Sequence, residues 1–428
     1  MSKDVENPWE PQDEGDHYPV KKEWWTIETF FTTPKNHHTW NLMTSFAYEL
    51  DTPSCFFQYV LFDITEKKCV LHKEINDAIE KLHHKKNRLA LHYDRSSLSG
   101  LHPNYYIHIE DSTHDFMIDY TYKAQSQPHM VAQDITGGTL PIGLNHYKYG
   151  FLPHCQSSGT IRLKQLESSI TGKGYLEHAW GNWSYQRPVQ MLSGLTDTIA
   201  TYGRLATWWC SHHTPRIPSH IGFTTENNPY GYDWLWGIFS NGWSLFLGNS
   251  LFWIKEGPIM GVLYVTPDGK TYWEFSDVTF QYTKQVYLEQ YDIYYPTEIK
   301  LKARSGDKYI QLTFTPATES YVYIDPYKKG RFYKAFILVE QPGTLHGTYS
   351  DDKTSLHLTG QGKFVPLRSP SFVGHNSVDL HVIKPPNGLG VKCTLDSRFF
   401  EKKATACVQL APKPKIQLRI KSLQNMHQ

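Results

Sequence analysis

The stretch Gly172–Trp183, with the sequence GKGYLEHAWGNW, concentrates groups that could move a proton next to an apolar ligand. A carboxylic acid that burial keeps protonated near neutral pH could protonate an alkene. The faces of neighbouring aromatic rings attract the resulting carbocation, each by roughly 0.5–2 kcal/mol. Glu177, close in sequence to Tyr175, His178 and Trp180, is therefore the first candidate for a catalytic acid.

The alternation of a β-strand places Tyr175 and Glu177 on one face and His178 and Trp180 on the other. We expect the first face to contact a ligand. Tyr175, His178 and Trp180 are further substrate-binding candidates. We expect His178 and Trp180 to support a domain interface. The alternative is that Glu177 forms a buried ion pair and that His178 is a core hydrogen-bond donor, because structural networks also perturb carboxylates.

Two further carboxylates precede tryptophans. Glu23 stands before Trp24, and Asp233 stands before Trp234. Both are further candidate acids, with a surface ion pair as the alternative for Glu23. The tryptophans that follow these carboxylates are candidates for the core or for the wall of a ligand cavity: Trp24, Trp25, Trp234 and Trp236. We expect the site where the stretch 175–180 approaches the stretch 233–236, because ligands favour domain interfaces.

Metal and cofactor motifs are not evident. The histidine pairs His37-His38, His83-His84 and His212-His213 are adjacent, so on a strand the two side chains of each pair face opposite sides. Cys210 and His212 are two positions apart, which on a strand would place both side chains on the same face, but no third ligand is near them in the sequence. No dinucleotide fingerprint, Walker loop or nucleophile elbow occurs. We expect no metal and no cofactor.

Composition narrows the functional class. The chain has 428 residues with 43 Lys and Arg against 42 Asp and Glu, and no basic stripe that would predict nucleic-acid binding. The aromatic fraction of 14% suits strands and apolar cavities. No leader-like or membrane-spanning apolar run is evident, so we expect a soluble cytoplasmic protein for which transient membrane contact stays open. Six widely spaced cysteines predict free thiols.

The elements that must position these residues are mostly strands. Period-2 alternation with turn residues recurs along the chain, as in the hairpin of 298–303 with 308–314 and around the turn Thr266-Pro-Asp-Gly-Lys. Helical signals are few: the spacing of Ile75, Ile79 and Leu82 predicts a helix over 73–84, and a second mixed segment covers 192–210. We expect less than about 15% helix, against a usual 30–35%.

Turn residues and interruptions of the strand pattern divide the chain into five parts. Residues 1–17 are expected to be extended or disordered, 18–188 and 230–365 to form two antiparallel β-barrel or sandwich domains, and 366–428 to form a β extension. Residues 189–229 interrupt the β pattern and are interpreted as an excursion between the domains that covers a cavity. Closing into a barrel removes sheet edges, and an eight-stranded barrel has room for one small ligand.

Four islands carry a resemblance to a known family: the opening Glu23-Trp24-Trp25, the stretch Gly172–Trp183, the second opening Tyr232-Asp-Trp-Leu-Trp-Gly, and the closing His357-Leu-Thr-Gly. Between Tyr18 and Phe364 their order resembles the carotenoid hydratase (hydroxyneurosporene synthase) and lipocalin-like Diels–Alderase family. The resemblance implies an all-β fold of two lipocalin-like domains packed side by side. The Gly-x-Gly-Tyr-x-x-His-x-Trp-Gly island is the most specific of the four.

The chain departs from the family pattern at two positions. Glu177 stands where the family commonly has Asp, and His357 stands where it commonly has Glu. His357 is therefore kept as a substrate-binding candidate. The resemblance implies a cofactor-free enzyme that acts on a hydrophobic polyene or isoprenoid by hydration, dehydration, isomerisation or pericyclic cyclisation. The alternative is a carrier for an apolar metabolite, and the sequence leaves the substrate and the oligomeric state open.

Overall fold

The computed structural model describes residues 9–142, 145–183, 195–212, 220–224, 231–250, 253–254, 257–258, 261–291, 293–329, 332–368, 376–383, 388–397 and 402–422. Within them the chain is almost entirely antiparallel β-structure, as expected. The α-helices in this part are α1 (Gln133–Thr136), of 4 residues, and α2 (Leu195–His212), of 18 residues. Short 3₁₀ turns are η1 (Pro11–Glu14), η2 (Ile79–Lys81) and η3 (Glu289–Tyr291).

The first sheet has thirteen strands in the order β4-β3-β2-β1-β13-β12-β9-β8-β7-β6-β5, with β10 and β11 paired to β12. Its edge strands β4 and β5 are joined only by η2, so the sheet curls until its two edges approach each other. The enclosed core contains Trp25, Phe46, Tyr59 and Ile107 among many buried residues. The strands are β1 (Lys22–Thr33), β2 (His38–Glu49), β3 (Ser54–Asp63), β4 (Lys68–Ala78), β5 (Leu82–His83), β6 (Leu89–Tyr93), β7 (Ser96–Leu101), β8 (Asn104–Asp111), β9 (Phe116–Ala124), β10 (His129–Met130), β11 (Thr139–Ile142), β12 (Asn145–Leu163) and β13 (Leu166–Asn182).

The second sheet has ten strands in the order β20-β19-β16-β15-β26-β25-β23-β22-β21, with β24 paired to β25. Its edge strands β20 and β21 are separated only by Ser276, so this sheet also curls on itself around a core of its own. The strands are β15 (Gly231–Phe239), β16 (Ser244–Ser250), β19 (Val262–Thr266), β20 (Trp273–Phe275), β21 (Asp277–Leu288), β22 (Ile293–Ser305), β23 (Lys308–Pro316), β24 (Tyr321–Lys329), β25 (Phe332–Ser350) and β26 (Ser355–Arg368). The two curled sheets are the two lipocalin-like units expected from the sequence.

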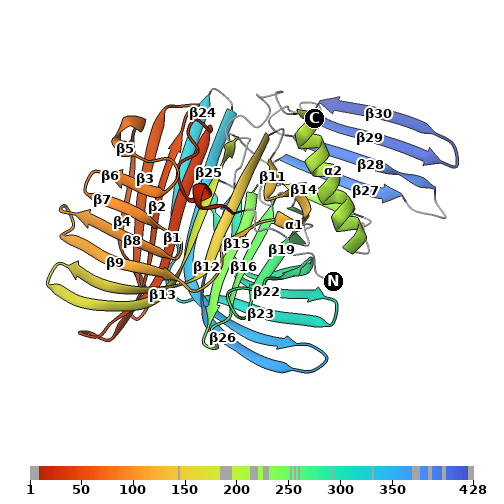
Figure 1. Cartoon of the computed structure of the whole chain (residues 1–428). Coiled ribbons are helices and arrows are strands. Elements are labelled where there is room, and N and C mark those ends of the chain that lie inside the picture. The colour runs from red at the N-terminus through yellow and green to blue at the C-terminus, as the bar shows by residue number, and fades with distance from the viewer. Residues whose placement is uncertain are drawn as a thin grey trace.

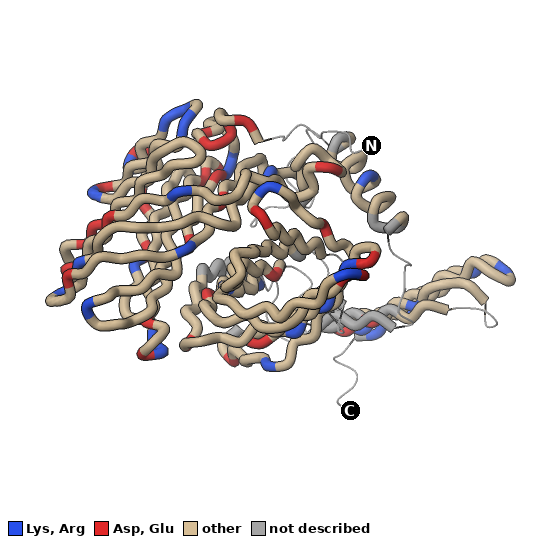
Figure 2. The backbone as a smooth tube through the Cα atoms, turned by 60° about the horizontal axis from the view of Figure 1, so that its bottom comes forward, with Lys and Arg blue, Asp and Glu red and all other residues tan. Residues whose placement is uncertain are grey.

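Two smaller sheets complete the described chain. The short strands β17 (Trp253–Ile254) and β18 (Gly257–Pro258) pair with each other. A five-stranded sheet combines β14 with the C-terminal strands and projects away from the two curled sheets (Figures 1 and 2). Its strands are β14 (His220–Thr224), β27 (Asn376–Ile383), β28 (Leu389–Ser397), β29 (Lys402–Ala411) and β30 (Lys415–Ser422).

The helix predicted over 73–84 is wrong. Residues 68–78 form β4, which pairs with β3 in the register Phe57↔Ile75, and only the three residues of η2 follow it. From Leu71 onward burial alternates with period 2, because one face of this edge strand is turned to the core that the first sheet encloses while the other faces solvent. Tertiary pairing with β3 therefore outweighs the local helical spacing of Ile75, Ile79 and Leu82.

Turn chemistry follows the sequence closely at the turn between β19 and β20. Asp268 Oδ1 accepts hydrogen bonds from the backbone N–H groups of Lys270 and Thr271, at 2.8 and 2.7 Å, and Gly269 takes a φ of +73°. The tip of the turn touches the first unit, where the Gln127 N–H donates to the Gly269 carbonyl at 2.6 Å. A Cβ on Gly269 would lie 2.3 Å from the Gln125 carbonyl oxygen, so glycine is required for this approach.

The two curled sheets pack back to back through strands near their centres. Figure 1 shows β12 of the first sheet beside β15 and β16 of the second, and these strands are in contact. A third buried cluster lies between the sheets, apart from the two cores that they enclose. Its buried members are Phe30, Val131, Ala132, Tyr149, Phe151, Tyr175, Ala179, Trp234, Trp236, Ile238, Phe246, Tyr264 and Val365.

Several other expectations can be compared with the described residues. Part of the predicted excursion is α2 and β14, and residues 189–194, 213–219 and 225–229 of it lie outside the described residues. Cys55, Cys69, Cys155, Cys393 and Cys407 are free thiols, and the Cys210 side chain lies outside the described part. No described helix is long and apolar enough to cross a membrane. Figure 2 shows acidic and basic residues interspersed over both curled sheets.

Candidate active site

The pairing of β1, β12 and β13 decides which side chains share the face between the two sheets. Thr26 and Phe151 are both register partners of Glu177, from either side of β13. Because paired residues of an antiparallel sheet point to the same face, Trp24 and Tyr149, the partners of Ala179, also lie on this face. The sequence therefore brings a carboxyl, an indole and a phenol together from three strands.

Three side chains donate hydrogen bonds to the Glu177 carboxyl. The Trp24 indole N–H donates to Oε1 at 3.1 Å, and the Tyr175 hydroxyl donates to Oε2 at 2.9 Å. The Tyr149 hydroxyl also donates to Oε2. Trp234 of the second sheet donates its indole N–H to the Tyr149 oxygen at 2.8 Å, so the network crosses from one sheet to the other.

Aromatic rings of the second sheet close around this network. The Tyr175 ring lies 5.1 Å from the Trp234 ring and 5.7 Å from the Trp236 ring, measured between centroids. Phe246 stacks on Phe151 at 4.2 Å. Glu177 therefore sits in a largely aromatic environment, in which its polar neighbours are phenol and indole donors and the Thr26 hydroxyl.

Burial raises the pKa of Glu177 above its ordinary value of 4.5, although hydrogen bonds from Tyr149, Tyr175 and Trp24 oppose this shift. Among the described residues no Lys, Arg or His forms an ion pair with Glu177. The buried-ion-pair alternative raised from the sequence therefore finds no partner in this part of the chain. Removing a carboxylate from water without a countercharge favours the neutral acid.

Asp233 is also buried, but its charge is compensated. Its Oδ1 lies 2.9 Å from the Arg368 guanidinium, both side chains are 1% exposed, and the Tyr282 hydroxyl donates to Oδ2. The charge of Asp233 is thus compensated by a buried arginine that follows it by 135 positions in the chain. Of these two carboxyls, Glu177 is therefore the one without a described countercharge, whereas Asp233 is in an ion pair.

A β-bulge places Tyr149 on the Glu177 face. The register between β12 and β13 shifts between Leu152 and Cys155, so β12 carries one extra residue there. A one-residue shift reverses the faces of all residues beyond it. The same bulge turns the Pro153 carbonyl toward the second sheet, where it accepts the Trp236 indole N–H at 2.8 Å.

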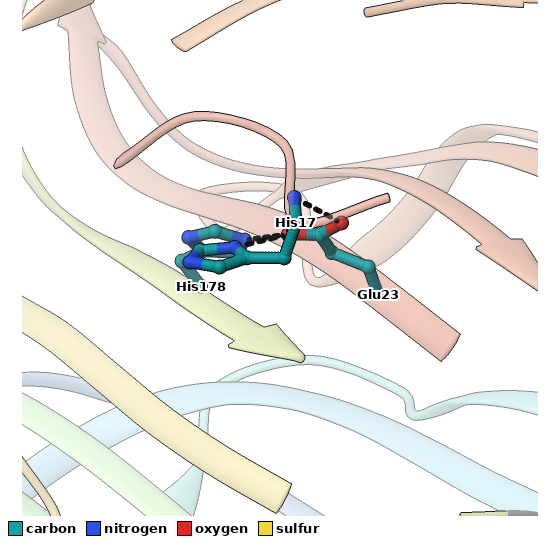
Figure 3. Close-up of side chains that lie close together, drawn as sticks. All are labelled: His17, Glu23 and His178. Atoms are coloured by element: carbon teal, nitrogen blue, oxygen red, sulfur yellow. Dashed lines mark hydrogen bonds and ion pairs between the residues drawn. The ribbon is translucent and has the colours of Figure 1, made fainter. Parts of the chain in front are cut away.

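Several other predicted site residues lie on the opposite face of β1 and β13. Trp25 and His178 are register partners that stack at 4.6 Å within the first unit. Glu23, 0% exposed, bonds to His178 Nε2 at 2.7 Å. Figure 3 shows Glu23 with His17 and His178 in one cluster.

The expectation that His178 and Trp180 support the domain interface is wrong. Both face the first unit, where they are covered by Trp9 from the N-terminal segment, and the face of Tyr175 and Glu177 forms the interface instead. His357 is exposed on β26, opposite Thr348, and is not part of the Glu177 network.

A second buried group of charges links the sheets beside this network. Lys363 of β26 lies 2.8 Å from Glu28 of β1 and 2.9 Å from Glu340 of β25. All three side chains are buried. Burial raises the pKa of Glu28, and so does Glu340, while Lys363 opposes the shift.

The sequence interpretation missed Tyr149, Phe246 and Lys363. All three lie on strands that alternation predicts, but their proximity to the site depends on pairing between distant segments. A separate hollow of about 520 Å³ lies across β8, β9, β12 and β13, and Glu177 does not line it.

Comparison with known proteins identifies relatives by fold. No family model matches the sequence, and no curated protein matches it. A protein provisionally named AttH from Nitrosomonas europaea superposes with a TM-score of 0.55 and 16% identity, over 83% of this chain and 95% of that chain. Kievitone hydratase from Nectria haematococca superposes with a TM-score of 0.53 and 12% identity, over 85% of this chain and 94% of that chain. At these identities the likeness concerns the fold, and it agrees with the two-unit architecture expected from the sequence.

Proposed function

We propose that this chain is an enzyme that binds a hydrophobic small molecule between its two β-sheet units and uses Glu177 as a proton donor. The observation that carries the proposal is a carboxyl buried among aromatic rings, with no described countercharge and with a raised pKa. Ionisable groups perturbed in this way concentrate at functional sites. The expected substrate class is an apolar alkene, such as a polyene or an isoprenoid.

Residual exposure indicates the side from which a substrate reaches Glu177. Glu177 and Tyr149 are each 8% exposed, whereas Tyr175 and Phe151 are 0% exposed. Trp24 and Thr26 on β1 are half-buried and continue the same face. Because the partly exposed residues of this face lie on the Trp24 side, we assign substrate entry to that side.

The hydrogen bonds favour one carboxyl oxygen as the donor. Both phenols donate to Oε2, while Oε1 accepts the Trp24 indole N–H, and the Thr26 hydroxyl is a further hydrogen-bond partner of the carboxyl. A proton on Oε1 therefore faces the half-buried side. In the acid step the Oε1–H bond breaks and a C–H bond forms on one alkene carbon.

After the acid step, a hydration needs only one water molecule as co-reactant. The adjacent carbon becomes a cation, which the faces of Trp24 and Trp234 stabilise. The oxygen of a water molecule bonds to this carbon, and the proton that it loses returns to the Glu177 carboxylate. The substrate gains one water and Glu177 recovers its acid form, so this sequence needs no cofactor, and its reverse is a dehydration.

The name of one neighbour supports this class of reaction, because kievitone hydratase has the same fold. Isomerisation and pericyclic cyclisation stay within the proposal, since a shaped apolar cavity with one or two hydrogen-bond donors suffices for them. The rival function is a carrier that holds an apolar metabolite unchanged. An uninterrupted apolar lining would favour the carrier, whereas the carboxyl and phenols between the sheets favour the enzyme.

The test begins by identifying the ligand. Native mass spectrometry of freshly purified protein, followed by solvent extraction, should reveal a co-purifying apolar compound. This compound and its close analogues are then incubated with the protein in ¹⁸O-labelled water and analysed by liquid chromatography–mass spectrometry. Hydration adds one labelled water, whereas isomerisation or cyclisation keeps the formula and changes the retention time.

Glu177→Gln keeps the size and the neutral, polar character of the protonated side chain but has no acidic proton, so it should still bind the ligand while turnover falls by about 10²–10⁴-fold. The matched control is Glu167→Gln, which changes an exposed glutamate on the same strand and should leave turnover unchanged. Normal turnover by Glu177→Gln would move the acid to Asp233 or Glu23. A wild-type protein that binds the compound and returns it unchanged would be a carrier.

A further inference from the structure

Three potential metal ligands converge on the face of β1 and β13 that is turned away from Glu177. They are His17 from the N-terminal segment, Glu23 from β1 and His178 from β13, and Figure 3 shows their side chains directed toward one another. One ligand atom from each residue lies within 4.8 Å of the others. The proposed acid Glu177 and the proposed substrate do not take part in this cluster.

One oxygen is the centre of the cluster. Glu23 Oε1 lies 2.8 Å from His17 Nδ1 and 2.7 Å from His178 Nε2. Glu23 and His178 are 0% exposed, whereas the His17 side chain keeps 21% exposure. The cluster is thus buried from the side of the sheet and reachable from the side of the N-terminal segment.

Counting donors and acceptors shows that a proton or a metal ion must lie between His178 and Glu23. His178 Nδ1 lies 2.7 Å from the carbonyl oxygen of Asp13, which only accepts, so Nδ1 carries a hydrogen. In the neutral ring Nε2 then presents a lone pair to the Glu23 carboxylate. A lone pair and a carboxylate oxygen 2.7 Å apart repel each other unless a proton or a metal ion lies between them.

The candidate ligands are oriented by hydrogen bonds to neighbouring groups. In known metal sites a ligating histidine likewise donates its other ring N–H to an oxygen. The Asp13 carbonyl plays this part for His178. Glu23 Oε2, the oxygen directed away from His178, accepts the Tyr48 hydroxyl at 2.7 Å and the His17 backbone N–H at 3.1 Å. The ring of His178 also stacks on Trp25, at 4.6 Å between centroids.

The cluster is one of several contacts that attach the N-terminal segment to the first unit. We call residues 9–20 the strap. Trp9 of the strap packs against Met130 and Trp180, and the His17 ring stacks on Trp180 at 4.2 Å. His17 is the strap residue in the cluster, and Glu23 and His178 belong to the sheet beneath it.

We propose that His17, Glu23 and His178 bind one divalent transition-metal ion of the zinc type, which fastens the strap to the first sheet. Two imidazoles and one carboxylate form a donor set that zinc accepts in proteins. Zinc bonds of about 2.0–2.1 Å set ligand atoms about 3.3 Å apart, so each imidazole must move outward by about half an ångström. His17 can make this movement because it lies on the strap and not in a sheet.

The experiment uses the full chain, freed of metal by a chelator and then dialysed. After addition of zinc chloride and gel filtration, elemental analysis should find about one zinc ion per chain. Bound cobalt(II) should give visible ligand-field absorption, a signature that needs no variant. A wild-type chain that retains no zinc and shows no cobalt band would overturn the proposal.

Two variants locate the site. His17→Gln should weaken zinc binding by at least ~100-fold, more than the roughly 10–100-fold typical of losing a residue that only orients a ligand. Its control is His108→Gln, because the His108 ring lies 2.6 Å from Asp119 and 3.8 Å from Glu110 but has no second histidine in its cluster. His108→Gln should bind zinc as the wild type does, and equal binding by His17→Gln would contradict the assignment. Circular dichroism in chelator checks that both variants keep the β-fold.

Discussion

The environment of a single carboxyl, and not its presence in a motif, separates the candidate acids. Glu177 and Asp233 are both buried and both follow the expected pattern of a carboxyl among aromatic residues. Asp233 is neutralised by Arg368, which lies 135 positions away in the sequence, and no local pattern predicts that pair. Strand alternation does predict that Tyr175 shares a face with Glu177, and they are hydrogen-bonded. The period-2 pattern thus predicts which residues of one strand share a face, but it does not predict the partners that come from distant strands.

The raised pKa of Glu177 has a consequence for the pH profile. Burial stabilises the neutral form, so the acid persists to a higher pH than for an ordinary glutamate. Since proton donation needs that form, kcat/KM should be high at low pH and fall as the pH rises through the raised pKa. The measurement is kcat/KM against pH, and the residual activity of Glu177→Gln should lack this descending limb. A limb that persists in the variant would assign the titration to another group.

The same shift also affects stability. Because the pKa of Glu177 is higher in the folded chain than in the unfolded chain, its stabilising contribution is complete at low pH and is lost as the pH rises through the folded-state pKa. Glutamine does not ionise. Urea unfolding should therefore show a smaller loss of stability at alkaline pH for Glu177→Gln than for the wild type.

At the scale of elements, the bulge in β12 decides which face Tyr149 occupies, and the sequence pattern does not predict this bulge. Extending the hairpin register Leu163↔Leu166 without a shift would pair Leu152 with Glu177 and would turn Tyr149 to the opposite face. The bulge between Leu152 and Cys155 reverses this assignment, and its only local sign is Pro153, which cannot donate to the ladder. The hairpin was predictable, whereas the phenol that bonds to Glu177 was not.

Another element-scale prediction concerns the strap. Gly150 of β12 lies beneath Trp9, and a Cβ at Gly150 would stand 1.6 Å from the Trp9 ring. Gly150→Ala should therefore displace Trp9 and reduce the free energy of unfolding by about 1–3 kcal/mol, as overpacking does. Limited proteolysis should then cleave the strap faster, while both sheets remain folded.

The control for this prediction is a glycine with room around it. Gly203 of α2 has no atom within 4 Å of the position that a Cβ would take. Gly203→Ala should be neutral or stabilising by up to about 1 kcal/mol, because alanine favours the helix. Equal strap cleavage in the two variants would show that Trp9 does not depend on the space above Gly150.

At the scale of the whole molecule, alternation and turn residues predicted two β units, and the edge strands joined by η2 and by Ser276 show how each sheet curls on itself. The third sheet illustrates the limit of this pattern. Alternation in β30 predicts a strand with one buried face, yet Ile416, Leu418 and Ile420 are 78%, 66% and 60% exposed. Period-2 spacing specifies a strand, but whether its apolar face is covered depends on the arrangement of the other sheets.

The last prediction concerns the buried charges that link the two units. Lys363 pairs with Glu28 of the first sheet and with Glu340 of its own sheet, in a buried triad of one cation and two carboxyls. Lys363→Met would leave the two carboxyls buried without a cation, and such a change typically costs about 3–5 kcal/mol. We expect urea unfolding, followed by tryptophan fluorescence, to shift to lower denaturant and to separate into two transitions.

A triple variant tests whether the triad or the apolar cluster holds the units together. Replacing all three charges by apolar residues, with Glu28→Leu, Lys363→Met and Glu340→Leu, removes the cost of desolvation along with the ion pairs, so stability should return to about the wild-type value. Recovery with a single transition would mean that the aromatic cluster around Trp236 suffices to join the sheets and that the triad contributes mainly to specificity. A cost below about 1 kcal/mol for Lys363→Met alone, typical of an exposed pair, would instead mean that water reaches the triad.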